Sequence, residues 1–339
     1  MFKKVVALMS AMALTVGMLS GCGIKSNTPV IGRLVGLDDD QVFKIGKLIC
    51  GKPEYMLALM DEANQMKATL GQGIKWDSKI NKKHTLEEYV LANVKEEVGI
   101  KYTMAAIAKS MNIKLTDTEI NSIETAATTY YNSLTDAEKK FTGAKLSDVV
   151  TLYKNYKLAD KAYNSETEDV DVSVSDEEAR VIKIEYIRMN TEKLPEAKIQ
   201  AKLKEVRKIV KNDWQPFSRE AKQYSLDSTY QKNIKKNEAT SEFDKAAFAL
   251  SKGQISKVLA IGNDRYLIYC VDSYLKKESA ANKAEIIRQK KQNTFALKYD
   301  NYLDDNTIDF NDRSVEGIEF PTTADFKTTS LWDIYQTIK

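Results

Sequence analysis

Apolar residues recur at intervals of three and four along residues 53–165, which is the period of amphipathic helices. The first run follows Pro53, and its apolar positions include Met56 and Met66. Three later runs each begin with a Thr-x-x-Glu pattern, in which the hydroxyl accepts one backbone N–H and the Glu reaches back to another. These three runs and a final one begin at Thr85, Thr116, Thr135 and Leu146. The pattern predicts a unit of helices joined by short turns.

The hydrophobic pattern changes after residues 165–176, an acidic and polar stretch that we interpret as a linker. Residues 180–189 alternate and are rich in β-branched side chains, so they predict a strand. The helices expected next are 195–211, 217–224 and 242–251, and the strands after them are 254–261 and 265–273. Only residues 262–264 separate the last two strands. Because so short a turn leaves no room for a parallel crossover, the sheet should be antiparallel.

Three other segments carry weaker patterns. Residues 42–50 predict a short strand or a hairpin. Residues 278–304 predict a long helix, which we expect to pack back on the N-terminal helices because it follows a β-rich unit. Residues 306–339 show no clear period, so this tail is either loosely ordered or docks locally through a few aromatic residues. The candidates for docking are Phe310, Phe320, Phe326 and Trp332.

The N-terminus has the pattern of an exported protein. Residues 1–21 contain two early lysines and an apolar run, which is typical of a secretory signal and short for a membrane span. The run ends at Ser20-Gly21-Cys22, which resembles the lipobox of bacterial lipoproteins. The resemblance implies lipidation of Cys22, and each buried methylene of such a lipid contributes about 0.8 kcal/mol to membrane binding. The alternative is an ordinary signal peptide with an incidental Cys.

Composition and charge exclude several classes of function. The 339 residues contain one His, so a metal cluster of several His or a two-histidine mechanism is excluded. That residue, His84, lies in a Lys-rich turn and is expected to be solvated. The net charge of +3 gives no reason to expect nucleic acid. Cys50 and Cys270 either form a disulfide in an oxidising exterior or are separate buried thiols.

Two motifs in the second unit resemble a known family. Residues 242–256 read Glu-Phe-Asp-Lys-Ala-Ala-Phe-Ala-Leu-Ser-Lys-Gly-Gln-Ile-Ser, and residues 217–227 read Phe-Ser-Arg-Glu-Ala-Lys-Gln-Tyr-Ser-Leu-Asp. Both are similar to motifs of parvulin-type peptidyl-prolyl isomerases, so residues 176–275 resemble such a domain. The order of signal, Cys, helices, inserted domain and final helix resembles the extracytoplasmic foldase lipoproteins of the PrsA type, which are related to the SurA chaperones.

The resemblance implies an α+β fold in which a helical chaperone domain contains an inserted parvulin-like domain. The helical domain combines N-terminal helices with a returning C-terminal helix, and the inserted domain combines a small antiparallel sheet with helices. The boundaries that we expect are a signal peptide at 1–21, a tether at 22–40, the helical domain at 41–175, the parvulin-like domain at 176–275, the C-terminal helix at 276–305 and the tail at 306–339.

The resemblance also implies which residues form the site. Tyr186 and Tyr266 stand at the positions where the family has histidines on its first and last strands, and Asp227 stands near its Cys or Asp. The positions of the proline pocket are matched by Phe243, Phe248 and Ala239. The family's Gly-rich segment is absent, because residues 228–242 contain no Gly. From the residues alone, both tyrosines could instead be ordinary sheet-core residues and Asp227 a turn residue.

These observations favour a membrane-anchored extracytoplasmic chaperone or foldase that binds unfolded or newly secreted polypeptides, without metal, cofactor or nucleic acid. Because both histidine positions are Tyr, we expect prolyl isomerase activity to be weak or absent, and an active isomerase is the alternative. A solute-binding or adhesive lipoprotein is a third class, but the repeated βα units typical of it are missing. A homodimer is compatible with the sequence. The Met-rich helix at 56–66 is either core or an adaptable surface for clients.

Overall fold

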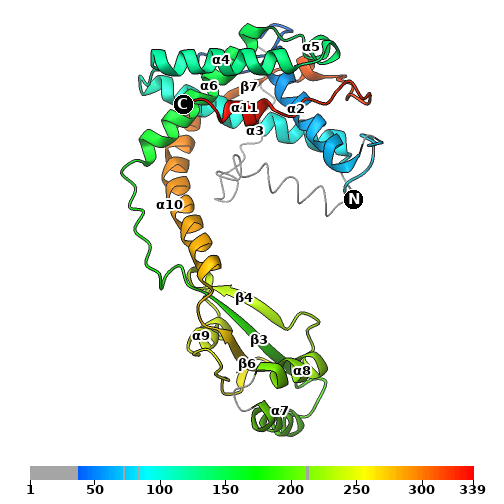
Figure 1. Ribbon diagram of the computed structural model, residues 1–339, viewed down its shortest axis with the longest axis vertical. Helices are drawn as coiled ribbons and strands as arrows, with labels where there is room; N and C mark the ends of the chain where they lie inside the picture. The colour runs from blue at the N-terminus through cyan, green and yellow to red at the C-terminus, as the bar shows by residue number, and fades with distance from the viewer. Residues whose placement is uncertain (1–36, 72, 83, 211–213) are drawn as a thin grey trace. The chain divides into compact units, whose positions relative to one another are not determined.

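The computed structural model describes residues 37–71, 73–82, 84–210 and 214–339. The described chain forms two compact units, a helical unit of residues 37–170 and 291–339 and an inserted unit of residues 171–290 (Figure 1). The α+β fold class is confirmed. The signal peptide, Cys22 and most of the tether fall outside the described residues.

The helical unit contains the helices that the apolar period predicts. They are α2 (Lys52–Leu70), α3 (Leu86–Ser110), α4 (Asp117–Ser133), α5 (Asp136–Thr142) and α6 (Leu146–Thr167). All three Thr-x-x-Glu capping boxes are present at the starts of α3, α4 and α5. Met56, Met60 and Met66 of α2 are buried. The suggestion that this helix offers an adaptable client surface is therefore wrong, because its methionines belong to the core.

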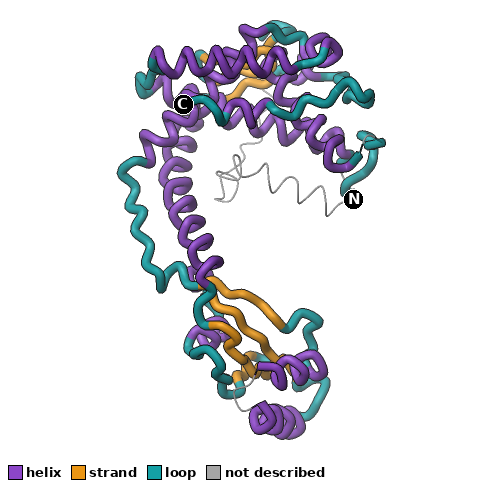
Figure 2. The backbone as a smooth tube through the Cα atoms, in the orientation of Figure 1, coloured by secondary structure: helices purple, strands orange, loops and turns teal. Residues whose placement is uncertain are grey.

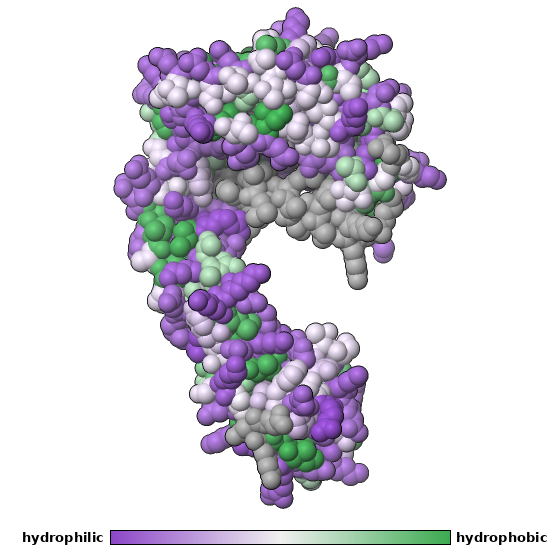
Figure 3. All heavy atoms as spheres, in the orientation of Figure 1, coloured by the Kyte–Doolittle hydropathy of each residue, from purple (hydrophilic) through white to green (hydrophobic). Residues whose placement is uncertain are grey.

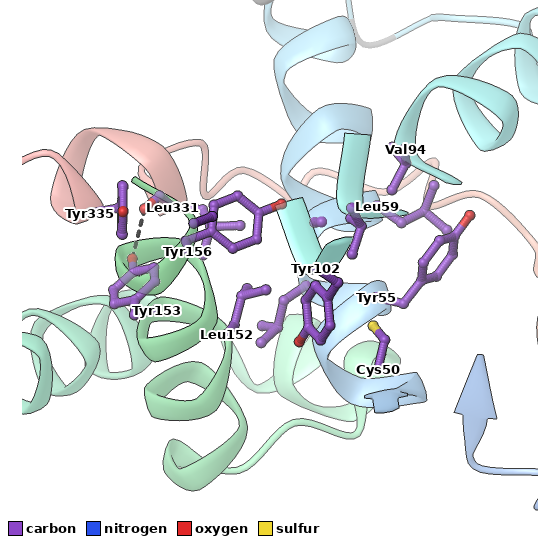
Figure 4. Close-up of a cluster of buried hydrophobic side chains, with 14 of the residues drawn as sticks. Cys50, Tyr55, Leu59, Val94, Tyr102, Leu152, Tyr153, Tyr156, Leu331 and Tyr335 are labelled. Carbon is purple, nitrogen blue, oxygen red and sulfur yellow. Dashed lines mark hydrogen bonds between the residues drawn. The ribbon is translucent and has the colours of Figure 1, made fainter. Parts of the chain in front are cut away.

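Large tyrosines fill the centre of the helical unit (Figure 4). Five of them are at most 2% exposed, namely Tyr55, Tyr102, Tyr130, Tyr153 and Tyr156. A buried Tyr contributes a large apolar ring, and its hydroxyl is most stable when it has a polar partner. Tyr102 on α3 meets this need by donating to Glu54 on α2, which ties the two helices together inside the core.

A small antiparallel sheet joins the two ends of the helical unit. Strands β1 (Gln41–Ile45) and β2 (Leu48–Gly51) form the hairpin, and β7 (Ile308–Phe310) pairs with the other edge of β1. The hairpin turn requires Gly46, whose φ is 57°, and a Cβ there would lie 2.8 Å from the hydroxyl of Tyr302.

The tail is ordered and packs on the helical unit, so the expectation of loose order is wrong. After β7 it forms the 3₁₀ turn η2 (Asp312–Val315), runs without regular structure, and ends in the short helix α11 (Leu331–Tyr335). All four aromatic residues named for docking do contact the helical unit. The tail shows no period because its contacts come from an extended path rather than from a helix face.

Helix α10 (Lys276–Asp305) is continuous through the boundary between the units. Its residues from 291 onwards belong to the helical unit, where Phe295 and Tyr299 are buried. The ring of Phe295 lies 5.4 Å from that of Tyr163 on α6. The contact boundary thus falls fifteen residues later than the boundary expected at 275 and 276, because the first turns of α10 pack on the inserted unit through Ile286.

The inserted unit contains a four-stranded antiparallel sheet with the strand order β4-β3-β6-β5. Its strands are drawn in orange in Figure 2, with helices around them. Its elements are β3 (Val181–Asn190), α7 (Glu196–Val210), α8 (Trp214–Tyr224), β4 (Gln231–Lys235), η1 (Lys236–Glu238), α9 (Glu242–Phe248), β5 (Leu259–Ile261) and β6 (Asp264–Asp272). Strand β4 was not predicted, because it is an edge strand whose single buried apolar residue is Ile234. The strand expected at 254–261 is shorter than predicted.

The two faces of this sheet are covered differently, because successive side chains of a strand point to opposite faces. Helices α7 and α8 cover the face that carries Ile187 and Leu267. Helix α9 covers the other face, which carries Ile184 and Ile268. Tyr186, two residues after Ile184, therefore faces α9.

The buried carboxyl of Glu54 predicts a pH-dependent stability. Burial raises its pKa to about 7. The unfolded chain releases this proton near pH 4.5 but the folded chain only near pH 7, so stability falls as pH rises through this window. The substitution Glu54→Gln removes this pH-dependent contribution to the free energy of unfolding. Its stability relative to wild type should therefore rise between pH 5 and pH 8, by up to about 3 kcal/mol at 1.36 kcal/mol per pKa unit.

Urea unfolding followed by circular dichroism at both pH values measures this difference. Glu96→Gln, which changes an exposed carboxyl on α3, serves as the matched control and should show no such rise. The same pH slope for Glu54→Gln and for wild type would contradict the assignment.

Candidate functional site

Three aromatic residues meet on the α9 face of the inserted sheet. We call Tyr186 of β3, Tyr266 of β6 and Phe243 of α9 the aromatic cluster. The ring centroid of Phe243 lies 5.3 Å from that of Tyr186 and 5.1 Å from that of Tyr266, and both pairs meet edge to face. The two tyrosine rings are 6.3 Å apart. Such contacts favour a fixed arrangement of the rings, because the edge of one ring is attracted to the face of the next.

The strand register brings these rings together. In the antiparallel pair of β3 and β6, Tyr186 lies opposite Ile268 and Arg188 lies opposite Tyr266. Residues 186, 188, 266 and 268 thus share one face. Phe243 reaches the same face because Ser241 caps α9 by accepting from the backbone N–H of Asp244, which fixes where the helix begins.

The tyrosine hydroxyls belong to a polar network. The Tyr186 hydroxyl donates to Oδ2 of Asp227 at 2.9 Å and lies 3.0 Å from the carbonyl oxygen of Thr229. The Tyr266 hydroxyl lies 3.4 Å from Oδ2 of Asp264. Each tyrosine is therefore connected to its own carboxylate.

Arg188 connects the two carboxylates. Its Nε lies 3.2 Å from Oδ1 of Asp227, and its Nη1 lies 3.5 Å from Oδ2 of Asp264. The result is a continuous chain of Tyr186, Asp227, Arg188, Asp264 and Tyr266 at the rim of the aromatic cluster. The Arg188 side chain is 34% exposed and the Asp227 side chain 29% exposed, so the network is accessible to a ligand.

Both tyrosines stay protonated at neutral pH. Burial, together with the bond to Asp227, raises the pKa of Tyr186 to about 12, and burial raises that of Tyr266. Because each hydroxyl has a single proton, a hydroxyl that donates to its carboxylate offers a ligand only its lone pairs. The arrangement can bind and orient a polar group, but neither tyrosine can act as a general base.

The three pocket residues expected from the sequence belong to one apolar layer, but only one of them lies in the aromatic cluster. Phe243 is in the aromatic cluster. The ring of Phe248 instead faces the guanidinium of Arg180, whose Cζ is 5.1 Å from the ring centroid. Ala239, just after η1, is half-buried against the same apolar layer as both phenylalanines. The structure thus brings Tyr186, Asp227, Tyr266 and Phe243 together and places Phe248 beside Arg180.

Three charged residues of the site were not expected from the sequence. Arg188 and Asp264 join the network, and Nζ of Lys232 on β4 lies 4.3 Å from the ring centroid of Phe243. Arg188 could have been found, because it lies two residues after Tyr186 on an alternating strand. Asp264 could not, because its proximity to Arg188 depends on the register of β3 and β6. Lys232 belongs to the unpredicted strand.

The cysteines and the histidine singled out in the sequence do not form a further site among the described residues. Cys50 and Cys270 are free, buried thiols in separate units, so the disulfide alternative is wrong. His84 is exposed, 3.8 Å from the carboxylate of Glu88. Among the residues that the structure describes, no group of three His, Cys, Asp or Glu could hold a metal ion. No helix within the described ranges is long and apolar enough to cross a membrane.

The class of the inserted unit follows from this fold and from a family comparison. Residues 183–272 match the family model described as "Rotamase: PPIC-type PPIASE domain". The inserted unit is therefore a parvulin-type domain, as the motifs in its sequence indicated.

Among the relatives, the "Foldase protein PrsA" of Staphylococcus aureus strain Newman is 25% identical over 180 residues, covering 48% of this chain and 56% of the relative. The protein of strain JH1 gives the same values. The chain thus spans about half the length of these curated relatives.

Solved structures give a weaker comparison. PrsA from Bacillus cereus is 18% identical, with 74% of this chain and 94% of that chain covered and a TM-score of 0.36. PrsA from Bacillus subtilis is 19% identical over the same shares, with a TM-score of 0.24. TM-scores this low leave the site geometry to be derived from this chain alone.

The polar network predicts a coupled titration. Asp227→Asn removes a negative charge beside the Tyr186 hydroxyl, and that charge opposes formation of tyrosinate. The pKa of Tyr186 should therefore fall from about 12, but stay above 10 because its burial remains. NMR of the labelled tyrosine ring carbons between pH 8 and pH 12.5 measures this shift.

Asp244→Asn is the matched control, because Asp244 faces Lys232 rather than Tyr186. It should leave the Tyr186 titration unchanged. An unchanged Tyr186 titration in Asp227→Asn would mean that the hydrogen bond between them does not form in solution.

Proposed function

We propose that this protein is an extracytoplasmic foldase that binds non-native secreted polypeptides, and that its parvulin-type domain has weak or no prolyl isomerase activity. The similarity to PrsA foldases supports the first part. The second part rests on one observation, which is that both tyrosine hydroxyls of the aromatic cluster face carboxylates.

Prolyl isomerisation places two demands on a site. The barrier of about 18–20 kcal/mol arises from amide resonance, which is lost as the peptide bond twists. An apolar surface has to hold the proline ring, and polar groups have to be aimed at the charges that change in the twisted state.

The site meets the need for an apolar surface better than the need for polar groups aimed at the twisted peptide bond. Phe243 and the two tyrosine rings form an apolar surface on which a proline or another apolar residue can rest. The hydroxyl protons, however, are directed at carboxylates instead of at a bound peptide. A tyrosine with a pKa of about 12 also transfers no proton at neutral pH. We therefore infer peptide binding with little acceleration of isomerisation.

One observation favours the alternative of an active isomerase. The Arg188 guanidinium has more N–H groups than its two carboxylate contacts use, and it is partly exposed next to both tyrosines. A donor at this place could hydrogen-bond to the prolyl nitrogen as the bond twists. This role for Arg188 would make the network catalytic rather than only structural.

An assay that needs no protease separates these functions. We expect kcat/KM for prolyl isomerisation at least about 100-fold below that of an active parvulin measured in parallel, since one well-placed donor is worth that much. The full chain should nevertheless suppress aggregation of an unfolded client. The double variant Tyr186→Phe with Tyr266→Phe keeps both rings and should retain that suppression.

Two results would change the assignment. Turnover at the level of an active parvulin that is lost in the folded double variant would establish the isomerase. Failure of the wild-type chain to suppress aggregation of any unfolded client would count against the foldase.

We also propose that the protein is anchored through lipidated Cys22 at the outer face of a bacterial membrane, where it could form a homodimer. The lipobox-like sequence around Cys22 supports the anchor. Wild-type protein expressed in bacteria should enter the detergent phase on Triton X-114 partitioning. Cys22→Ala should move to the aqueous phase, whereas Cys50→Ala, the control, should partition like wild type. Detergent-phase recovery of Cys22→Ala would rule out the anchor.

A further inference from the structure

The last part of the tail is held mainly through its backbone. Residues 323–339 lie against α2, α4, α5 and α6 in the helical unit, in the segment coloured red in Figure 1. Residues 326–330 of this segment have no regular secondary structure and only 331–335 form the short helix α11, so many of its backbone groups are not used up by helix hydrogen bonds. The backbone N–H and C=O groups of the tail therefore need hydrogen-bond partners among the side chains of the helices.

Buried carboxylates accept the N–H groups of the tail. Oε1 of Glu138 on α5 accepts from the backbone N–H of Lys327 at 2.7 Å and of Thr328 at 2.8 Å. Oδ1 of Asp61 on α2 accepts from the N–H of Leu331 at 3.1 Å. Both carboxylate side chains belong to residues with no exposed surface.

Donors on the same helices bind the carbonyl groups of the tail. Nζ of Lys67 donates to the carbonyl oxygens of Thr323 at 2.6 Å and Phe326 at 3.0 Å. Nδ2 of Asn64 donates to that of Thr328 at 2.9 Å. Further along, the Tyr153 hydroxyl donates to the carbonyl of Leu331 at 2.6 Å, which is the dashed line in Figure 4.

We call the surface formed by Asp61, Asn64, Lys67, Glu138 and Tyr153 the backbone groove. Each of these five side chains forms a hydrogen bond with a backbone N–H or C=O group of the tail. Every residue of a polypeptide has both groups, except that proline lacks the N–H. Such contacts do not depend on the side chains of the bound segment.

Aromatic side chains of the tail fill the spaces between these contacts. Trp332 stacks on Tyr156 of α6 at 4.6 Å, and Tyr335 lies 5.4 Å from Tyr153. Phe326 meets the edge of Phe141 at 5.3 Å. An occupant of the groove should thus carry one large aromatic or apolar residue in an irregular stretch and two more in a following helical turn, six and nine positions later, as Phe326, Trp332 and Tyr335 do.

We propose that the backbone groove is a binding site for aromatic-rich segments of non-native polypeptides, and that the tail occupies it as a self-ligand that such a segment displaces. This inference rests on the proposed foldase function and names where a client binds. The charges of the groove support a polypeptide occupant. Buried carboxylates and an ammonium left without partners are unfavourable, and a purely apolar occupant would leave them so.

The exposed surface also supports a polypeptide as the occupant of the backbone groove. On the face drawn in Figure 3, hydrophobic residues form small separate patches among hydrophilic ones. Once the tail leaves, the groove exposes the aromatic rings that the tail had contacted and the side chains that had bonded to its backbone. A tethered segment competes at a high effective concentration, so weakening the tail should increase the apparent affinity for a client in proportion to the open fraction.

The variant Trp332→Ala tests this competition. It removes a half-buried ring from the tail and leaves the five groove residues intact. Full-length protein is titrated with a fluorescent peptide of residues 318–339 and, separately, with reduced and carboxymethylated α-lactalbumin. We expect Trp332→Ala to bind both probes at least fivefold more tightly than wild type. Adding Glu138→Gln to Trp332→Ala should reverse most of this gain.

Trp214→Ala is the matched control, because Trp214 is 40% exposed in the inserted unit and far from the tail in sequence. It should bind like wild type. Equal binding of the unfolded protein by wild type and folded Trp332→Ala would overturn the groove but leave the foldase function. Binding of the peptide alone would support the groove and overturn the foldase function. No binding of either probe would overturn both.

If Trp332→Ala does not fold, hydrogen exchange of the wild-type protein tests whether a client displaces the tail from the backbone groove. The amides of Thr328 and Leu331 are bonded to the groove carboxylates and should be protected in the free protein. A saturating unfolded client that displaces the tail should make both amides exchange at least tenfold faster. Unchanged protection with the client bound would overturn the proposal.

Discussion

The need of buried polar groups for partners shapes both units of this protein. In the helical unit, Glu138 has no exposed surface, and its carboxylate accepts hydrogen bonds from the backbone of two tail residues. Those bonds lower its pKa in spite of its burial. Without the tail, the carboxylate would keep the bonds from Asn64 and from the backbone N–H of Thr135 but would lose those from Lys327 and Thr328. The order of a segment with no hydrophobic period thus depends on charges that lie more than a hundred residues earlier.

The same need organises the parvulin-type domain. Tyr186 and Tyr266 each face a carboxylate, and Arg188 neutralises both carboxylates from between them. The network makes the aromatic cluster a defined surface, and it also directs the hydroxyl protons away from a bound peptide. This arrangement is the basis on which we propose peptide binding with little isomerase activity.

In the function that we propose, the two units recognise polypeptides in complementary ways. The aromatic cluster selects apolar side chains and offers few hydrogen bonds, whereas the backbone groove offers hydrogen bonds to peptide groups of any sequence. A foldase has to bind many clients, and recognition of the backbone provides that breadth because it does not read side chains. In the same proposal, the tail limits binding to segments that can compete with it.

Much of the fold could be predicted from local sequence. Thr-x-x-Glu patterns and apolar periods placed the starts of α3, α4 and α5, and alternation placed β3, because these signals arise between residues close in the chain. The motifs around Phe217 and Phe243 identified the parvulin-type domain, and the positions of Tyr186, Asp227 and Tyr266 followed from it. Strand β4 was missed because an edge strand needs only one buried residue.

Only the tertiary structure decided the contacts that join distant segments. The pairing of β3 with β6 brought Asp264 to Arg188, and the buried carboxylates Asp61 and Glu138 ordered the tail. The sequence by itself determined the class of the inserted domain, most of the helices and the absence of a histidine pair, since composition and short spacings carry that information. Register and burial are properties of the assembled chain, so the role of each polar residue emerged only once its partner was in place.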